Sequence, residues 1–180
     1  MVKRRAVFLD RDGVLNKPVV RDGRPFPPDT VADLEILSGV ADACRALSAA
    51  WLMLIGVTNQ PDVARGSRTM ADIRAINDSL GRRLGLDDMR VCPHADDHDC
   101  GCRKPRPGML VEAARDFDID LITSIMVGDR WRDIEAGKAA GCRTVFIDYG
   151  YNERRPDGAD FECNGLAEAV PWILGAITEP

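Results

Sequence analysis

The stretch Ala6-Val7-Phe8-Leu9-Asp10-Arg11-Asp12-Gly13-Val14-Leu15-Asn16 decides the fold of this 180-residue chain. Its first four residues are apolar and favour a strand that is buried on both faces, as the strands of parallel sheets are. Two carboxylates, Asp10 and Asp12, follow at once, and Gly13 indicates a tight turn. Open α/β sheets bind ligands at the carboxyl ends of their strands, so this pair of aspartates could be the start of a site. Asp and Gly are also common in turns, so the alternative is an ordinary solvated turn.

Outward from this stretch, apolar strands and amphipathic helices alternate along the whole chain. We expect strands at 6–9, 52–57, 89–92, 125–127 and 144–147. Helices should begin near residues 38, 70, 108, 131 and 166, with Ser38 and Thr69 as N-caps of the first two. This alternation predicts an α/β fold of three layers, with a parallel five-stranded sheet between helices.

The organisation of the chain is predicted to be simple. No repeat, low-complexity tract or interdomain linker interrupts the pattern, so residues 1–180 should form a single domain. The proline-rich segment 16–28 is expected to be a loop, and we expect no cap domain between Asn16 and the first helix or in the cysteine-rich segment. We therefore expect an open site, with specificity set by the loops that surround it.

Composition and charge narrow the class of protein. Hydrophobic residues make up 45% of the chain and charged residues 29%, which is the globular range. A net charge of −5 argues against a nucleic-acid binder, which would show a basic face. No apolar run has the length of a membrane span or of a signal-peptide core. We expect a cytoplasmic monomer that acts without nucleic acid or a membrane.

Polar clusters follow three of the predicted strands and precede one helix. They are Asp10-Arg11-Asp12-Gly13, Thr58-Asn59-Gln60, Gly128-Asp129-Arg130 and, before the helix, Arg103-Lys104-Pro105. In a parallel sheet all four fall at the same edge. Since Mg²⁺ prefers oxygen ligands, Asp10 and Asp129 are predicted to bind it through their side chains and Asp12 through its backbone carbonyl.

A site of this composition suits phosphoryl transfer. Asp10 would attack phosphorus and form an aspartyl-phosphate. Lys104 and Mg²⁺ would neutralise the charge on the phosphoryl oxygens, and the hydroxyl of Thr58 would donate a hydrogen bond to them. Asp12 would protonate the leaving alkoxide and then activate water for the second step.

The clusters Asp-Arg-Asp-Gly-Val-Leu-Asn, Thr-Asn-Gln, Arg-Lys-Pro and Gly-Asp-Arg, in this order, resemble the four motifs of the haloacid dehalogenase (HAD) superfamily of phosphotransferases. The resemblance covers residues 5 to about 150. It implies a Rossmann-like HAD fold and the roles given above for Asp10, Asp12, Thr58, Lys104 and Asp129. Asp133, one helical turn further on, would support the metal or complement the helix dipole.

Three cysteines and a histidine crowd into eleven residues, at Cys92, His94, Cys100 and Cys102. In a reducing compartment such clustering favours a metal over disulfides, and a tetrahedral structural zinc site fits the four side chains. His98 is an alternative to His94, and a loop of free thiols is the alternative to a metal site. Because Cys102 directly precedes Arg103 and Lys104, the zinc would staple the loop that presents the lysine.

A zinc loop at this position, together with Ala64-Arg65-Gly66 and the run from Cys102 to Met109, resembles one HAD subgroup. This subgroup contains the D-glycero-D-manno-heptose 1,7-bisphosphate 7-phosphatases and the histidinol-phosphate phosphatases. The resemblance implies hydrolysis of a small sugar phosphate, with loss of the 7-phosphate of a heptose bisphosphate. The residues expected to contact the substrate are Arg11, Asn59, Gln60, Arg103 and Arg130.

Two alternatives stay open at this point. The loop 17–26 and Pro61-Asp62 depart from the heptose phosphatases, so histidinol phosphate or another small metabolite is an alternative substrate. Within that loop Arg21 and Arg24 could bind a second phosphate or be exposed charges. The more distant alternative is a zinc-stabilised binding module without activity. The presence of every catalytic residue argues against this alternative.

Overall fold

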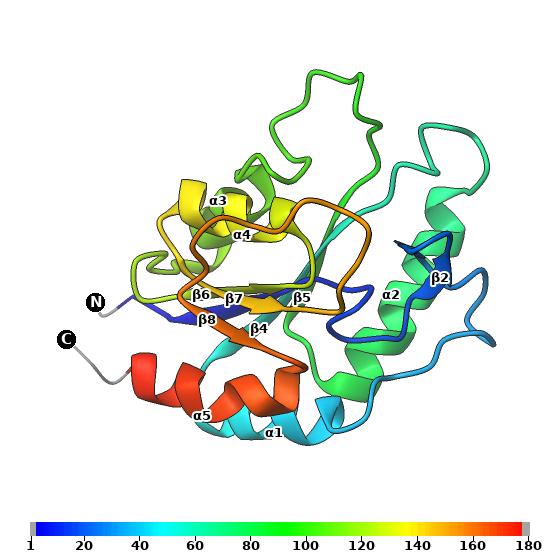
Figure 1. Cartoon of the computed structure of the whole chain (residues 1–180). Coiled ribbons are helices and arrows are strands. Elements are labelled where there is room, and N and C mark those ends of the chain that lie inside the picture. The colour runs from blue at the N-terminus through cyan, green and yellow to red at the C-terminus, as the bar shows by residue number, and fades with distance from the viewer. Residues whose placement is uncertain (1–2, 178–180) are drawn as a thin grey trace.

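A parallel sheet forms the centre of the molecule in a computed structural model that describes residues 3–177 (Figure 1). The strand order is β5-β4-β1-β6-β7-β8, and every neighbouring pair is parallel. The strands are β1 (Ala6–Leu9), β4 (Met53–Asn59), β5 (Asp88–Cys92), β6 (Ile125–Gly128), β7 (Arg143–Ile147) and β8 (Phe161–Cys163).

The predicted three-layer α/β fold is confirmed, but the sheet has six strands rather than five. The additional strand is β8, which lies at one edge and pairs with β7. It contains only three residues, one of them an exposed glutamate, and therefore lacks the apolar run by which the other strands were recognised.

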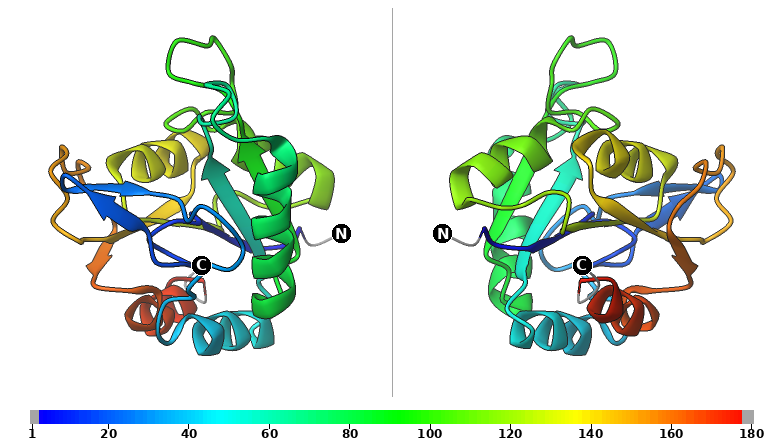
Figure 2. Two further views of the ribbon diagram at one scale, coloured as in Figure 1. Left: turned by 90° about the vertical axis from the view of Figure 1, so that its right-hand side faces the viewer. Right: turned by 90° about the vertical axis from the view of Figure 1, so that its left-hand side faces the viewer.

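Helices cover both faces of the sheet, as Figures 1 and 2 show. They are α1 (Val40–Ala49), α2 (Met70–Leu84), α3 (Gly108–Phe117), α4 (Trp131–Ala140) and α5 (Leu166–Ala176). Val7 and Leu9 of β1 pack with α1, α2 and α5, whereas Ala6 and Phe8 pack with α3 on the opposite side. All four residues are fully buried, which explains why β1 is apolar without alternation.

The ends of the helices follow local chemistry at most positions. Thr69 caps α2 as predicted, because its hydroxyl accepts from Asp72 N while the Asp72 carboxylate accepts from Thr69 N. The predicted cap Ser38 was wrong by one residue, since α1 is preceded by Gly39 in the left-handed region at φ 76°. Among residues 3–177, no helix combines the length and apolarity that crossing a membrane requires.

The segment 16–28, expected to be a loop, contains an antiparallel hairpin of β2 (Val19–Arg21) and β3 (Arg24–Phe26). Pro25 and Phe26 from this hairpin line the cleft at the carboxyl edge of the sheet. The side chains of Arg21 and Arg24, considered above as phosphate ligands, lie outside the part of the chain that the structure describes.

Candidate active site

The four polar clusters meet in an open cleft of about 630 Å³ at the carboxyl edge of the sheet. Asp10 follows β1, Thr58 lies near the end of β4, and Lys104 enters from the segment between β5 and α3. This segment extends away from the body of the protein in both views of Figure 2. The predicted residues that line the cleft are Asp10, Asp12, Thr58, Asn59, Gln60, Arg103, Lys104 and Arg130.

The ammonium group of Lys104 links the first cluster to Asp133, the carboxylate that follows the third cluster. Its Nζ lies 2.6 Å from Asp10 Oδ1 and 2.6 Å from Asp133 Oδ1, and it donates to the backbone oxygen of Val57 at 2.7 Å. Burial alone would lower the pKa of Lys104, but the charges of Asp10 and Asp133 outweigh it and raise that pKa. The lysine is therefore a fixed positive charge in a nearly water-free position.

Three buried carboxylates, those of Asp10, Asp129 and Asp133, have oxygens within 4.8 Å of one another. Burial raises the pKa of Asp10 to about 6, although Lys104 opposes this shift. Burial, and then repulsion by Asp10 and Asp133, raise the pKa of Asp129 well above its ordinary value. Within the described residues neither carboxylate oxygen of Asp129 has a hydrogen-bond partner. A hard divalent cation with oxygen ligands fits this group, because it would satisfy both the charge and the free oxygens.

Asp133 caps a helix and also lies in the acidic group, so its position is compatible with both roles considered for it. Its Oδ2 accepts from the backbone N of Arg130 at 3.0 Å, which caps α4, while its Oδ1 contacts Lys104. The helix cap therefore also fixes one carboxylate of the acidic group, and the two readings of the sequence do not exclude each other.

Gly13 allows the backbone of the first cluster to lie directly against Asp129. Its φ is +99°, and a Cβ atom at this position would be 1.9 Å from Asp129 Oδ2. No other residue fits here, because a side chain would both strain the backbone and displace the carboxylate. The turn after Asp12 is thus held at the acidic group.

The carboxylate of Asp12 is held by three neighbouring side chains. Arg11 and Gln60 donate to its Oδ2, and Asn16 donates to its Oδ1 at 3.0 Å. Arg11, predicted to contact the substrate, does not line the cleft: its side chain is fully buried and also donates to Asn77 of α2. The turn after β1 points this long side chain inward, which the sequence pattern did not reveal.

Asn59 and Gln60 line the cleft but also hold other site residues. The Asn59 side chain donates to the backbone oxygen of Lys104 at 3.0 Å and accepts from its backbone N at 3.1 Å. Gln60 Nε2 lies 2.8 Å from the hydroxyl oxygen of Thr58. The end of β4 therefore fixes both the lysine loop and the threonine.

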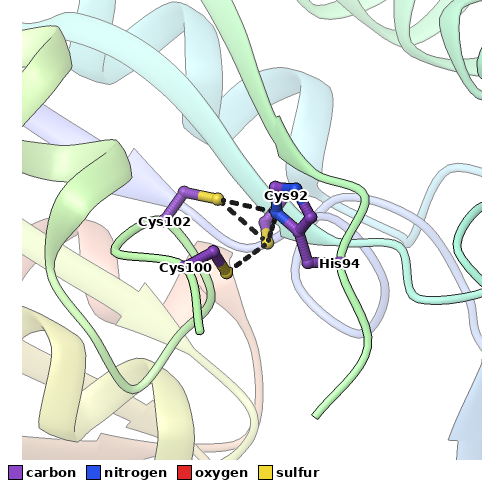
Figure 3. A group of neighbouring side chains, drawn as sticks. All are labelled: Cys92, His94, Cys100 and Cys102. Carbon is purple, nitrogen blue, oxygen red and sulfur yellow. Dashed lines mark hydrogen bonds between the residues drawn. The ribbon is translucent and has the colours of Figure 1, made fainter. Parts of the chain in front are cut away.

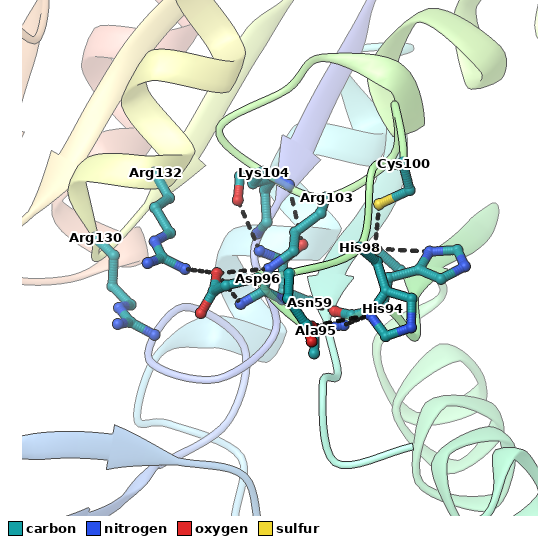
Figure 4. Close-up of polar contacts among 12 residues, drawn as sticks. Asn59, His94, Ala95, Asp96, His98, Cys100, Arg103, Lys104, Arg130 and Arg132 are labelled. Atoms are coloured by element: carbon teal, nitrogen blue, oxygen red, sulfur yellow. Dashed lines mark hydrogen bonds and ion pairs between the residues drawn. The ribbon is translucent and has the colours of Figure 1, made fainter. Parts of the chain in front are cut away.

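Arginines and their acidic partners also line the cleft, and Figure 4 shows Asp96 with Arg103 and Arg132. Asp96 Oδ1 lies 2.8 Å from Arg103 Nη2 and 3.0 Å from Arg132 Nη1, and Arg130 pairs with Glu153. Sequence reasoning did not assign Asp96, Arg132, Glu153 or Asn77 to the site. The pairs Arg130–Glu153 and Arg132–Asp96 are 23 and 36 residues apart in the sequence, and Asn77 lies 66 residues from Arg11, so no local pattern could reveal them. Asp96 is only seven residues from Arg103, but it lies in a loop without periodicity.

The predicted metal loop brings Cys92, His94, Cys100 and Cys102 together (Figure 3). Sulfur and nitrogen atoms of the group lie 3.1–3.8 Å apart where they are in contact, and all lie within 4.8 Å. Ligands of a tetrahedral zinc ion lie about 3.8 Å apart when each Zn–S bond is near 2.3 Å. Burial and the neighbouring Cys92 raise the pKa of Cys102, because they disfavour its thiolate form. A bound cation would stabilise that thiolate. The group fits a metal ion.

His98, the alternative ligand, is placed differently. Its Nδ1 accepts from the backbone N of Ala95 at 3.3 Å, and its ring centroid lies 5.7 Å from that of His94. It is not one of the four residues whose ligand atoms converge. The structure therefore favours His94 over His98.

The chain resembles known phosphatases in sequence. A family model described as HAD-hydrolase-like matches residues 101–169. The D-glycero-beta-D-manno-heptose-1,7-bisphosphate 7-phosphatase of Bordetella bronchiseptica is 36% identical, over 94% of this chain and 98% of its own length. The D-glycero-alpha-D-manno-heptose-1,7-bisphosphate 7-phosphatase of Campylobacter jejuni is 33% identical, over 89% of this chain and 90% of its own.

A solved structure agrees with these relatives. The crystal structure of the D,D-heptose 1,7-bisphosphate phosphatase from B. bronchiseptica, complexed with magnesium and phosphate, matches with a TM-score of 0.81 at 32% identity. The match covers 95% of this chain and 98% of that one. Fold and site thus define a hydrolase of the HAD type that acts as a phosphatase. Within this class the chain belongs to the family of the heptose-1,7-bisphosphate 7-phosphatases, which confirms the resemblance seen in the motifs.

The acidic group predicts that Mg²⁺ stabilises the protein in a pH-dependent way. The folded-state pKa of Asp10 is raised from 3.8 to about 6 without metal. Its contribution to stability is thus present below the unfolded pKa and is lost as the pH rises through about 6. Mg²⁺ should therefore raise the melting temperature more at about pH 7.5 than at about pH 5.

Thermal unfolding with EDTA or Mg²⁺ tests this expectation. Asp129→Asn should lose most of the Mg²⁺-dependent shift, whereas Asp42→Asn, at an exposed carboxylate on α1, should keep it. An equal shift at both pH values, or an unchanged shift in Asp129→Asn, would contradict the assignment of this group as the cation site.

Gly13→Ala should abolish Mg²⁺-dependent activity, because its methyl group would displace the Asp129 carboxylate. Gly85→Ala is the matched control, since Gly85 also has a positive φ but has open space where a Cβ would lie. Both variants should lose about 1–2 kcal/mol of stability through backbone strain. Only Gly13→Ala should lose Mg²⁺ affinity, measured by titration calorimetry, and equal Mg²⁺ affinity in the two variants would show that the close approach has no role.

Proposed function

We propose that this chain removes the 7-phosphate from D-glycero-D-manno-heptose 1,7-bisphosphate in a Mg²⁺-dependent reaction. The observation that carries the proposal is the buried ammonium of Lys104, held 2.6 Å from both Asp10 and Asp133 beside the free oxygens of Asp129. Phosphoryl transfer needs an attacking carboxylate, a positive charge for the phosphoryl oxygens and an acidic seat for a metal. The relatives named for this substrate support its choice.

In the first step Asp10 attacks phosphorus and forms an aspartyl-phosphate, while Asp12 gives a proton to the leaving sugar oxygen. Lys104 and the hydroxyl of Thr58 bind the phosphoryl oxygens. In the second step Asp12 takes a proton from water, which attacks phosphorus and frees Asp10. Asp10, Asp129 and the backbone carbonyl of Asp12 would hold Mg²⁺, which supplies positive charge where the phosphoryl oxygens gain negative charge.

The rim of the cleft binds the remainder of the substrate in this proposal. Arg103 and Arg130 present guanidinium groups, which suit a phosphate or a sugar hydroxyl. Asn59 and Gln60 line the same cleft. The anomer that is preferred then depends on this rim and on the hairpin, since relatives named for both anomers match the chain.

The cysteine group holds a structural zinc ion in this proposal, because three thiols and an imidazole leave no open position for chemistry. Its role is to hold the segment that carries Arg103 and Lys104. Residues 1–180 act as a single domain, and the enzyme works as a cytoplasmic monomer without nucleic acid or membrane partners.

A panel of phosphate esters tests the activity through Mg²⁺-dependent phosphate release. The panel contains both heptose 1,7-bisphosphate anomers, histidinol phosphate and a DNA 3′-phosphate. One heptose anomer should be preferred, and Asp10→Asn should lower its turnover by more than about 10³-fold. Asp62→Asn, which changes another carboxylate of the cleft, should be far less affected. Preference for histidinol phosphate would show that the proposed heptose substrate is wrong, and retained turnover in Asp10→Asn would overturn the mechanism.

The zinc assignment predicts about one equivalent of zinc per chain by atomic emission spectrometry. Cys102→Ala should lose the metal and most of the phosphatase activity, because the loop that carries Lys104 is released. Cys163→Ala, at a buried cysteine outside the group, should keep both. Full metal content in Cys102→Ala, or full activity after the metal is lost, would contradict the role of the loop.

A further inference from the structure

Arg11 stands between the two aspartates of the first cluster, yet its side chain does not enter the cleft. It has no exposed surface and is among the largest fully buried side chains of the described residues. Burying a guanidinium group costs free energy unless an anion and further acceptors compensate it. The partners of the buried guanidinium therefore indicate the role of Arg11.

The anion beside Arg11 is the carboxylate of Asp12. Arg11 Nε lies 3.1 Å and Nη2 2.9 Å from the same oxygen, Asp12 Oδ2. The third nitrogen, Nη1, donates to Asn77 Oδ1 at 3.0 Å, which ties the guanidinium to α2. A planar group held at its far end by a helix can fix the orientation of the carboxylate at its near end.

Two amide side chains complete the arrangement around Asp12. Gln60 Nε2 donates to Oδ2 at 3.1 Å, and Asn16 Nδ2 donates to Oδ1 at 3.0 Å. Among the described residues, Asn16 Oδ1 and Gln60 Oε1 have no hydrogen-bond partner. Both amides are therefore oriented by the hydrogen bonds that their nitrogens donate, including those to the Asp12 carboxylate. Asp12 itself keeps 15% of its side chain exposed and lines the cleft.

We propose that Arg11 is a positioning residue for proton transfer by Asp12, an inference that rests on the proposed function. Proton transfer requires the donor and acceptor atoms to lie within about 2.6–3.2 Å, so a carboxyl group that rotates freely is rarely productive. Arg11 contacts Asp12 from the protein interior and holds its carboxylate in one orientation. The side of Asp12 that faces the cleft stays open. The guanidinium transfers no proton and touches no substrate.

The protons balance without Arg11. As the bond between Asp10 and phosphorus forms and the ester P–O bond breaks, the proton moves from the Asp12 carboxyl to the leaving oxygen. In the second step a water proton returns to Asp12 as the water oxygen bonds to phosphorus and Asp10 is released. Misplacement of Asp12 therefore slows the first step most when the leaving oxygen is strongly basic.

Leaving-group dependence separates positioning from a merely structural role. The single-turnover rate of leaving-group release is measured with the preferred sugar phosphate and with 4-nitrophenyl phosphate, whose leaving group needs no proton. Arg11→Met should slow release from the sugar phosphate by about 10²-fold or more, but from the nitrophenyl ester by less than about tenfold. KM should change little, because Arg11 does not line the cleft.

Further variants keep the test decisive if Arg11→Met fails to fold. Arg11→Lys, which retains the charge but not the fork, should show an intermediate selective loss, and Asn77→Leu a smaller loss of the same kind. Thr69→Ala weakens the cap of α2 and should slow neither ester selectively. Equal slowing of both esters in the Arg11 and Asn77 variants would overturn the inference.

Asp12→Asn separates this inference from the proposed function on which it rests. If Asp12→Asn shows the selective loss and the Arg11 variants do not, the positioning role is wrong while the role of Asp12 stands. If Asp12→Asn itself slows both esters equally, the acid role of Asp12 is wrong, and the positioning role is overturned with it.

Discussion

The contact between the Lys104 ammonium and the carboxylates of Asp10 and Asp133 is the interaction on which the site depends. It joins segments that are 94 residues apart in the sequence and lies almost entirely out of water. Burial raises the pKa values of Asp10 and Asp129, and repulsion by neighbouring carboxylates, which one ammonium cannot neutralise, raises them further. The site therefore carries an excess of negative charge, which a divalent cation can balance.

The rest of the carboxyl edge serves to hold this lysine and its partners in place. Asn59 clamps the backbone of Lys104 from the end of β4, and the cysteine group constrains the same segment two residues earlier. The cap of α4 fixes Asp133, and Gly13 brings the first turn against Asp129. Each device acts on the backbone or on a buried carboxylate, so the reacting groups are held before a substrate arrives.

Much of this could be predicted from the sequence because the rules involved are local or topological. A buried strand that ends in Asp10 and Asp12 can be recognised directly, and parallel strands bring their carboxyl ends to one edge. Thr69 and Asp72 identified the start of α2, and the cysteine spacing predicted that Cys92, His94, Cys100 and Cys102 converge. The pattern could not give the short edge strand β8, which lacks an apolar run, or the direction of the Arg11 side chain. Long-range partners such as Asn77 and Glu153 carry no periodic or spacing signal either.

The central claim is that Asp10 carries the phosphoryl group, and chemical trapping tests it most directly. Enzyme quenched during turnover is reduced with borohydride, which converts an aspartyl-phosphate to homoserine, and the peptide that contains residue 10 is examined by mass spectrometry. The account predicts homoserine at position 10 with substrate and Mg²⁺, and none without substrate. Homoserine at a different aspartate, or none while phosphate is being released, would contradict it.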